Sequence, residues 1–178
     1  MSGKIYLVDS GGGLQAMEEA PYEAEELLQK LLAEYPDLLA GDQMRPTAPR
    51  RWLLVSRDLG VPEDASERGR WSLDHLFIDQ EGIPTLVEVK RSSNTQIRRE
   101  VVGQMLDYAA NAITYWPVQT IRAKYEATCE QRGDDPDEFL NDTLGGDAEE
   151  GVDVEAFWRQ LDVNLRAGRM RLVFVADE

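Results

Sequence analysis

Two short apolar segments joined by a glycine-containing turn constrain the fold of this chain more than any other feature. They span residues 71–79 (WSLDHLFID) and 84–90 (PTLVEVK), with Gln80, Glu81 and Gly82 at the turn between them. Segments of this length and composition, separated by such a turn, predict the two strands of a β-hairpin. We therefore expect a β-sheet that contains this hairpin.

Charged residues interrupt both segments, although a strand covered on both faces rarely carries them. Asp74 lies within the first segment, and Glu88 and Lys90 lie near the end of the second. Because side chains alternate across a strand, Glu88 and Lys90 share one face. Charges are kept inside a protein only when they are paired or bound to a metal. These three residues are therefore candidate site residues.

This arrangement suits metal-assisted hydrolysis of a phosphodiester. Asp74 and Glu88, on neighbouring strands, would offer carboxylate ligands to Mg²⁺ or Mn²⁺. Mg²⁺ typically takes one or two carboxylates and completes its shell with water and substrate phosphate. Such an ion acidifies water and neutralises charge in the transition state. Lys90 would hold the attacking water and offset phosphate charge.

A later segment carries two more polar candidates, Gln104 and Tyr108. They stand four positions apart in a segment that predicts a helix, so their side chains point the same way. Gln104 follows Val101 by three residues and falls on the apolar face of this helix, where an amide needs a hydrogen-bond partner. The neighbouring site would supply that partner.

The motifs D, E-x-K and Q-x-x-x-Y, in this order and on these elements, resemble those of the PD-(D/E)XK, or restriction-endonuclease-like, nuclease superfamily. Asp74 matches the first acid, Glu88-Val89-Lys90 the E-x-K motif, and Gln104 to Tyr108 the helix motif. Leu73 stands where the family pattern has proline, which is a common variation. The resemblance covers about the middle third of the chain closely and the flanking helices loosely.

The resemblance implies both a fold and an activity. The fold is an α/β domain with a restriction-endonuclease-like core, in which helices flank a mixed β-sheet. The activity is that of a magnesium-dependent endonuclease, a hydrolase of phosphodiester bonds in nucleic acid, with DNA rather than RNA as the expected substrate. Asp74 and Glu88 would bind the metal, Lys90 would position water, and Gln104 with Tyr108 would support the site or touch the substrate.

The helix expected within residues 21–39 adds another candidate. Its leucines recur at helical spacing, and the segment resembles the first helix in one branch of the same superfamily, where a glutamate reaches the metal site. By that resemblance Glu25 is the candidate, with Glu26 second. Acids in the first turn also stabilise a helix without any catalytic role, and this alternative stays open.

A structural interpretation of the same residues competes with the catalytic one. Glu88 and Lys90 could form a solvated pair at a strand end, and Gln104 with Tyr108 could be the polar tip of a packed helix. Likeness of fold alone does not establish chemistry. The alternative function is therefore a non-catalytic module that keeps the nuclease fold to bind nucleic acid or a protein partner.

The charge of the chain argues against simple coating of nucleic acid. It has 34 acidic against 19 basic residues and a net charge of −15, whereas proteins that coat DNA carry a basic stripe. Its basic residues nevertheless concentrate around the proposed site, at Arg68, Arg70, Lys90, Arg91, Arg98 and Arg99. We expect a local positive groove on an acidic body and weak non-specific affinity, with another domain or partner delivering the substrate.

The 178 residues are enough for one domain with a hydrophobic core. Its sheet is expected from residues 52–58, 71–79, 84–90 and 171–176. Residues 134–153 are acidic and contain glycine, which predicts a mostly solvated insertion. Relatives in the superfamily continue into further helix after the last strand, so we expect the N-terminal, nuclease-like part of a longer bacterial protein.

The cysteine content and the hydropathy pattern set the remaining expectations. The single cysteine, Cys129, excludes an intramolecular disulfide and suits a reducing cytoplasm. One His and one Cys exclude a zinc cluster, and no apolar run is long enough to span a membrane. The expected partners are nucleic acid and either a second copy, as a homodimer, or an additional C-terminal domain.

Overall fold

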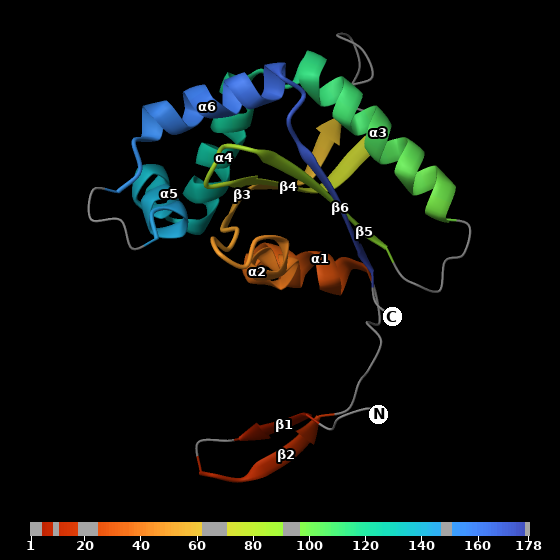
Figure 1. The fold of residues 1–178 in the computed structure, drawn as a ribbon, viewed down its shortest axis with the longest axis vertical. Helices are drawn as coiled ribbons and strands as arrows, with labels where there is room; N and C mark the ends of the chain where they lie inside the picture. The colour runs from red at the N-terminus through yellow and green to blue at the C-terminus, as the bar shows by residue number, and fades with distance from the viewer. Residues whose placement is uncertain are drawn as a thin grey trace.

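A four-stranded mixed sheet forms the centre of the computed structural model, which describes residues 5–8, 11–17, 25–61, 71–90, 97–146 and 151–176 (Figure 1). Its strands lie in the order β3 (Trp52–Val61), β4 (Trp71–Asp79), β5 (Pro84–Lys90) and β6 (Arg171–Ala176). The first three pair antiparallel, and β6 pairs in parallel with β5. The predicted mixed sheet is confirmed, with β3 three residues longer than expected.

The turn of the β4–β5 hairpin is closed by the side chain of Asp79. Its Oδ1 accepts hydrogen bonds from the backbone N–H groups of Glu81 (2.9 Å) and Ile83 (3.0 Å). Gly82 adopts a positive φ of 67° in this turn, which glycine tolerates without strain. The register that follows places His75 opposite Val87.

Helices flank both faces of this sheet (Figure 1). On one side lies α1 (Glu25–Glu34), and on the other lie the remaining long helices α3 (Ile97–Tyr115), α4 (Val118–Arg132), α5 (Pro136–Leu144) and α6 (Val154–Arg166). Each side has its own apolar core. Leu28 and Leu32 of α1 pack with Phe77, Val87 and Val89, whereas Leu76 and Leu86 pack with residues of α3 to α6.

The helix expected within residues 21–39 is present. It spans α1 and ends before Pro36, because proline cannot continue the hydrogen-bond ladder of a helix. A short 3₁₀ turn (Pro36–Leu39) and the single-turn helix α2 (Gly41–Met44) follow. Residues 21–24 lie outside the described part of the chain.

Part of the segment expected to be a solvated insertion packs onto the core instead. Helix α5 lies within residues 134–153, and its Leu140 and Leu144 are buried in the core on the α3–α6 side. Asp135 caps this helix by accepting hydrogen bonds from two backbone N–H groups in its first turn. This acidic segment thus contains a helix that is packed against the core through its leucines.

A separate two-stranded sheet lies near the N-terminus. It pairs β1 (Ile5–Val8) antiparallel with β2 (Leu14–Met17) and is not part of the central sheet. Every side chain described in it is exposed. Within the part of the chain that the structure describes, no helix has the length and apolar character needed to cross a membrane.

Candidate active site

The C-terminal end of β5 brings Glu88 and Lys90 into direct contact. Glu88 is 2% exposed, and its Oε1 lies 2.8 Å from the Lys90 Nζ. Both side chains point to the same face of β5, as the alternation of the strand predicted. The pair is therefore buried at the carboxylate and partly open at the ammonium group, rather than being the solvated pair that the structural interpretation describes.

Asp74 joins this pair from the neighbouring strand β4. The His75–Val87 pairing puts Asp74 next to the end of β5, and its Oδ2 accepts a 2.7 Å hydrogen bond from the backbone N–H of Val89. The charge of Asp74 also raises the pKa of Glu88. The two acids and the lysine, up to 16 positions apart in sequence, thus lie together as predicted.

Burial dominates the electrostatics of Glu88. It raises the pKa of the carboxyl above its usual value, and the negative charge of Asp74 acts in the same direction. The hydrogen bond from Lys90 and, more weakly, the backbone N–H of Asp74 oppose this shift without cancelling it. Glu88 Oε2 is buried and has no hydrogen-bond partner of normal length among the described residues.

Lys90 is held in its charged form by the acids around it. Burial alone would lower the pKa of this lysine, but its hydrogen bond to Glu88 and the charges of Glu88, Asp74 and Glu25 raise it. Glu25 Oε2, on α1, lies 3.9 Å from Lys90 Nζ. The site therefore holds a permanent cation between carboxylates from three different elements.

Gln104 and Tyr108 meet each other on α3, as their spacing predicted. The Gln104 side-chain amide donates to the Tyr108 hydroxyl, which in turn donates to the carbonyl oxygen of Ser72 on β4 at 3.1 Å. Burial raises the pKa of Tyr108, and the charges of Glu88 and Asp74 raise it further. The Gln104 amide thus has Tyr108 as its partner. Tyr108 in turn anchors α3 to Ser72 of β4, which lies two residues before Asp74.

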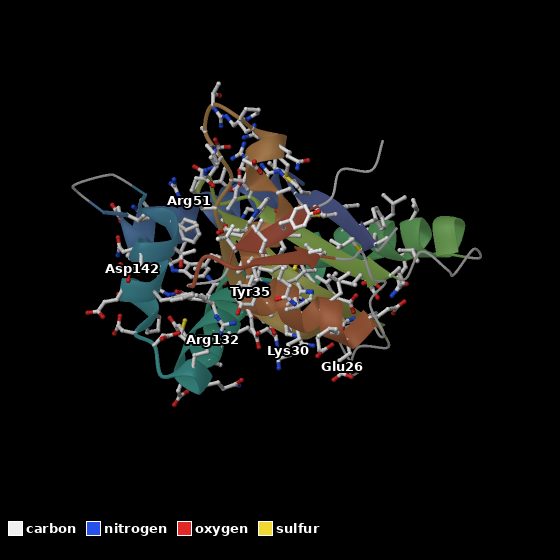
Figure 2. All side chains as sticks on the ribbon, turned by 90° about the horizontal axis from the view of Figure 1, so that it is seen from below. Glu26, Lys30, Tyr35, Arg51, Arg132 and Asp142 are labelled. Atoms are coloured by element: carbon white, nitrogen blue, oxygen red, sulfur yellow. The ribbon has the colours of Figure 1, made fainter. Side chains whose placement is uncertain are left out.

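The two glutamates at the start of α1 differ in position. Glu25 reaches the site through Lys90, whereas Glu26 is exposed on the outer side of α1 (Figure 2). The first candidate therefore lies at the site and the second does not. Both glutamates lie in the first turn of α1, where they can also stabilise the helix.

The basic residues expected around the site are described only in part. Arg68, Arg70 and Arg91 lie outside the described residues, as do the side chains of Arg98 and Arg99 in α3. Lys90 is the member of this group whose side chain the structure describes. The predicted positive groove around the site stays a prediction.

Sequence patterns gave no sign of two contributions to the site, because both come from the backbone. These are the Val89 N–H that binds Asp74 and the Ser72 carbonyl that binds Tyr108. The lone histidine, His75, is buried beside the site but faces α1, where its Nε2 lies 2.8 Å from the carbonyl oxygen of Gln29. Burial lowers its pKa, so it is a packed, neutral residue.

The residues present fit a divalent ion of the Mg²⁺ type. Asp74 and Glu88 supply two carboxylates, and the unpartnered Glu88 Oε2 is an oxygen left available for a cation. Among the described residues no cluster of three or more His, Cys, Asp or Glu side chains could hold a metal. A site with two carboxylates matches the preference of Mg²⁺ for few protein ligands and several waters.

Comparison of the chain with protein-family models, curated proteins and solved structures gave no match. The likeness to the restriction-endonuclease-like nucleases therefore depends on the motif residues and their geometry.

Proposed function

We propose that this chain is a divalent-metal-dependent nuclease with a restriction-endonuclease-like core, which hydrolyses phosphodiester bonds of nucleic acid, with DNA rather than RNA as the proposed substrate. The observation that carries this proposal is Glu88. Its carboxylate is buried beside a second acid, Asp74, and one of its oxygens lacks a hydrogen-bond partner among the described residues. A fold that gains only stability from such a group would satisfy both oxygens.

The perturbed acidity of Glu88 supports a functional role. Burial and the nearby Asp74 both raise its pKa, so the folded protein disfavours the charged form that a metal ligand requires. A pKa perturbed by burial together with a specific charged neighbour is typical of functional sites. A cation at the free oxygen would offset both effects.

Each side chain of the cluster has a distinct part in the proposed reaction. A divalent ion held by Asp74 and Glu88 would acidify a water molecule and neutralise the charge that develops on the phosphate. Lys90 keeps its proton, and its ammonium group would orient the attacking water and bind a non-bridging phosphate oxygen. Glu25 fixes Lys90 from the other side.

Gln104 and Tyr108 act as positioning residues in this proposal. The tyrosine hydroxyl ties α3 to the Ser72 carbonyl of β4, and so fixes the strand that carries Asp74. The glutamine amide holds the hydroxyl in turn. Their loss would displace an acid rather than remove a reacting group.

Cleavage assays with Mg²⁺ or Mn²⁺ test the proposal on DNA and RNA substrates. Lys90→Ala and Asp74→Ala are each expected to lower the cleavage rate by at least about a hundredfold, as does loss of one charge-stabilising group in other enzymes. Lys30→Ala, which removes an exposed lysine of α1, is the matched control and should cleave like the wild type. Cleavage that survives both site substitutions would refute the proposal.

The acidic character of the chain favours one alternative, a non-catalytic nuclease-fold module that binds nucleic acid or a protein partner. A net charge of −15 opposes the close approach of a polyanionic substrate. Calorimetry separates the two functions, because a nuclease site takes up Mn²⁺ and Glu88→Gln should abolish that uptake. Absence of Mn²⁺ uptake by the wild type would favour the module.

A further inference from the structure

A hollow of about 360 Å³ between β3 and α4 is lined by basic residues and, among the described residues, by no acid. Its cations are Arg57 of β3 and Lys124 and Arg132 of α4, and Ser56, Thr128 and Gln131 add polar groups. Acids outnumber bases by 34 to 19 in this chain. An acid-free hollow with three bases therefore stands out from the general charge pattern.

Two of these cations have no counter-ion within the described part of the chain. None of the ion pairs found there involves Arg57 or Lys124. The Arg57 Nε is also buried without a hydrogen-bond partner among these residues. A buried donor without an acceptor destabilises a fold, and more so when it is charged. An anion bound beside this guanidinium would supply acceptors that the described residues do not.

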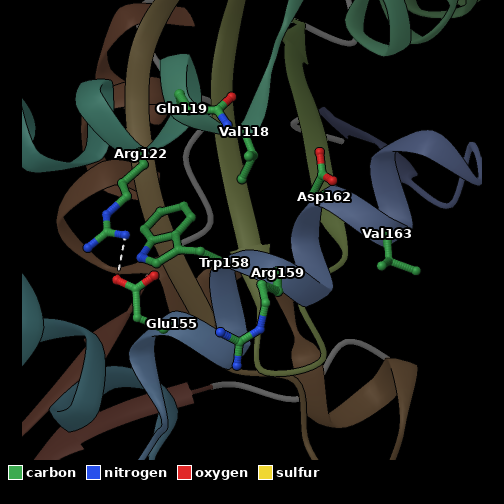
Figure 3. A pocket seen from close by; sticks show the side chains of 8 residues that line it. All are labelled: Val118, Gln119, Arg122, Glu155, Trp158, Arg159, Asp162 and Val163. Carbon is green, nitrogen blue, oxygen red and sulfur yellow. Dashed lines mark hydrogen bonds and ion pairs between the residues drawn. The ribbon is translucent and has the colours of Figure 1, made fainter.

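The hollow between α4 and α6 shows the opposite arrangement (Figure 3). Its Arg122 donates to Glu155 at 2.8 Å and also contacts Glu126, and its guanidinium stacks on the Trp158 ring at 5.7 Å. Asp162 in the same hollow pairs with Arg166. Arg122, Glu155 and Asp162 are thus paired within the protein, whereas no ion pair among the described residues involves Arg159 of the same hollow.

The walls of the basic hollow are held by defined contacts. Thr128 Oγ1 donates to the Val55 carbonyl at 2.7 Å and so fixes α4 against the edge strand β3. Arg132, at the end of α4, donates to the Ala33 carbonyl and lies over the Phe139 ring (Figure 2). These contacts keep the cations at the hollow without using the charges of Arg57 and Lys124.

A second hollow of about 480 Å³ continues from the first, since both are lined by Leu54 and Arg132. Trp52 lines this extension, and its indole N–H is buried without an acceptor among the described residues. Arg51, Phe139 and two acids, Glu34 and Asp37, also line it. The combined groove therefore has basic groups and no acid at the β3–α4 end, and a mixed wall of aromatic and charged groups at the other.

We propose that this groove along β3 binds the phosphate of a nucleotide-sized ligand, with Arg57, Lys124 and Arg132 as its phosphate contacts. Arginine and lysine are the side chains that bind phosphate best. A volume of this order suits a molecule larger than a single anion, and the Phe139–Trp52 end accommodates a base. The phosphate belongs either to a free nucleotide or to a unit of a nucleic acid chain. The inference stands apart from the proposed hydrolysis, because it needs no reaction.

Binding measurements in EDTA, which stops any metal-dependent cleavage, test this site. The probes are adenosine 5′-monophosphate and adenosine by calorimetry, and a single-stranded DNA oligonucleotide by fluorescence anisotropy. Combining Arg57→Gln with Lys124→Gln is expected to weaken binding of the phosphate-bearing probe by at least about tenfold. Arg169→Gln, which changes an exposed arginine beyond the end of α6, is the matched control and should bind like the wild type.

The two sources of phosphate give different results. If the oligonucleotide binds, its affinity should fall with salt, and the double substitution should reduce that salt slope by about two. If only the mononucleotide binds, the ligand is a free nucleotide. If the double variant fails to fold, Lys124→Glu alone tests the site, because Lys124 is exposed. The inference is wrong if neither phosphate probe binds, if adenosine binds equally well, or if the substitutions have no effect.

Discussion

Asp79 and Glu88 are two buried acids on the same hairpin, and their surroundings differ completely. Asp79 is fully buried, and its Oδ2 accepts from Arg50 at 2.9 Å and from Arg171 at 2.7 Å. Its other oxygen accepts the two backbone N–H groups of the turn. Glu88 has Lys90 on one oxygen and no partner among the described residues on the other.

The difference shows what each acid contributes. Both oxygens of the Asp79 carboxylate accept two hydrogen bonds each. Through Arg171 and Arg50 the carboxylate joins the turn to β6 and to the segment before β3. Glu88 instead has a raised pKa, so its ionised form reduces stability. A buried acid therefore indicates a reactive site only where the fold leaves it incompletely satisfied.

Asp79→Asn gives the largest expected effect in this comparison. Removing one partner of a buried ion pair typically lowers the free energy of unfolding by about 3–5 kcal/mol. Here it leaves Arg171 without its ion pair and Arg50 with Glu81 alone. Urea unfolding measures this loss. Mn²⁺ uptake at the other end of the hairpin should persist under conditions where the variant is folded. A loss below about 1 kcal/mol would mean that Asp79 is no structural anchor.

Tyr108→Phe should have a smaller effect on stability, of about 1 kcal/mol. It removes the hydroxyl that joins Gln104 to the Ser72 carbonyl, and a net hydrogen bond contributes about that much. Because this hydroxyl positions β4, we expect the cleavage rate to fall more than the affinity for substrate. Steady-state kinetics on the variant separate the two parameters, and an unchanged rate would remove Tyr108 from the proposed site.

Glu88→Gln should leave stability within about 1 kcal/mol of the wild type, or raise it, because the raised pKa means that the fold disfavours the charged carboxylate, and Lys90 keeps the charges of Asp74 and Glu25 nearby. The variant should also lose Mn²⁺ uptake. Thermal unfolding and calorimetry on the same preparation test both parts. A loss as large as that of Asp79→Asn would show that Glu88 is a structural acid and would end the contrast between the two residues.

The pH dependence of stability offers the finest test. Because the pKa of Glu88 is higher in the folded than in the unfolded chain, the folded state takes up the proton first as pH falls. Stability relative to Glu88→Gln should therefore rise as pH falls through the folded pKa, and level off below the unfolded pKa. Urea unfolding of both proteins from pH 7 downward measures the difference. A constant difference would contradict the raised pKa.

The β4–β5 hairpin and its three site residues were predictable because they follow from short-range rules. Alternation puts Glu88 and Lys90 on one face, and a tight turn sets the register that brings Asp74 beside them. The four-residue spacing of Gln104 and Tyr108 is a helix rule of the same kind. These elements needed no knowledge of distant parts of the chain.

Other features depend on contacts that sequence patterns do not encode. Arg50 and Arg171 reach Asp79 from 29 and 92 positions away, so its anchoring role has no local signal. Leu140 and Leu144 lie among acidic residues, so the sequence pattern gave no sign that tertiary packing buries them. The basic hollow likewise draws its residues from β3 and α4, which are far apart in sequence.

The bond from the Val89 amide to Asp74 Oδ2 makes one backbone proton a reporter on the site. Its exchange with solvent depends on a side-chain acceptor, so protonation of Asp74 or recruitment of that oxygen by a cation should alter the protection of this single amide. An isotope-labelled sample would thus reveal the state of the carboxylate by NMR, with neither substrate nor catalysis required.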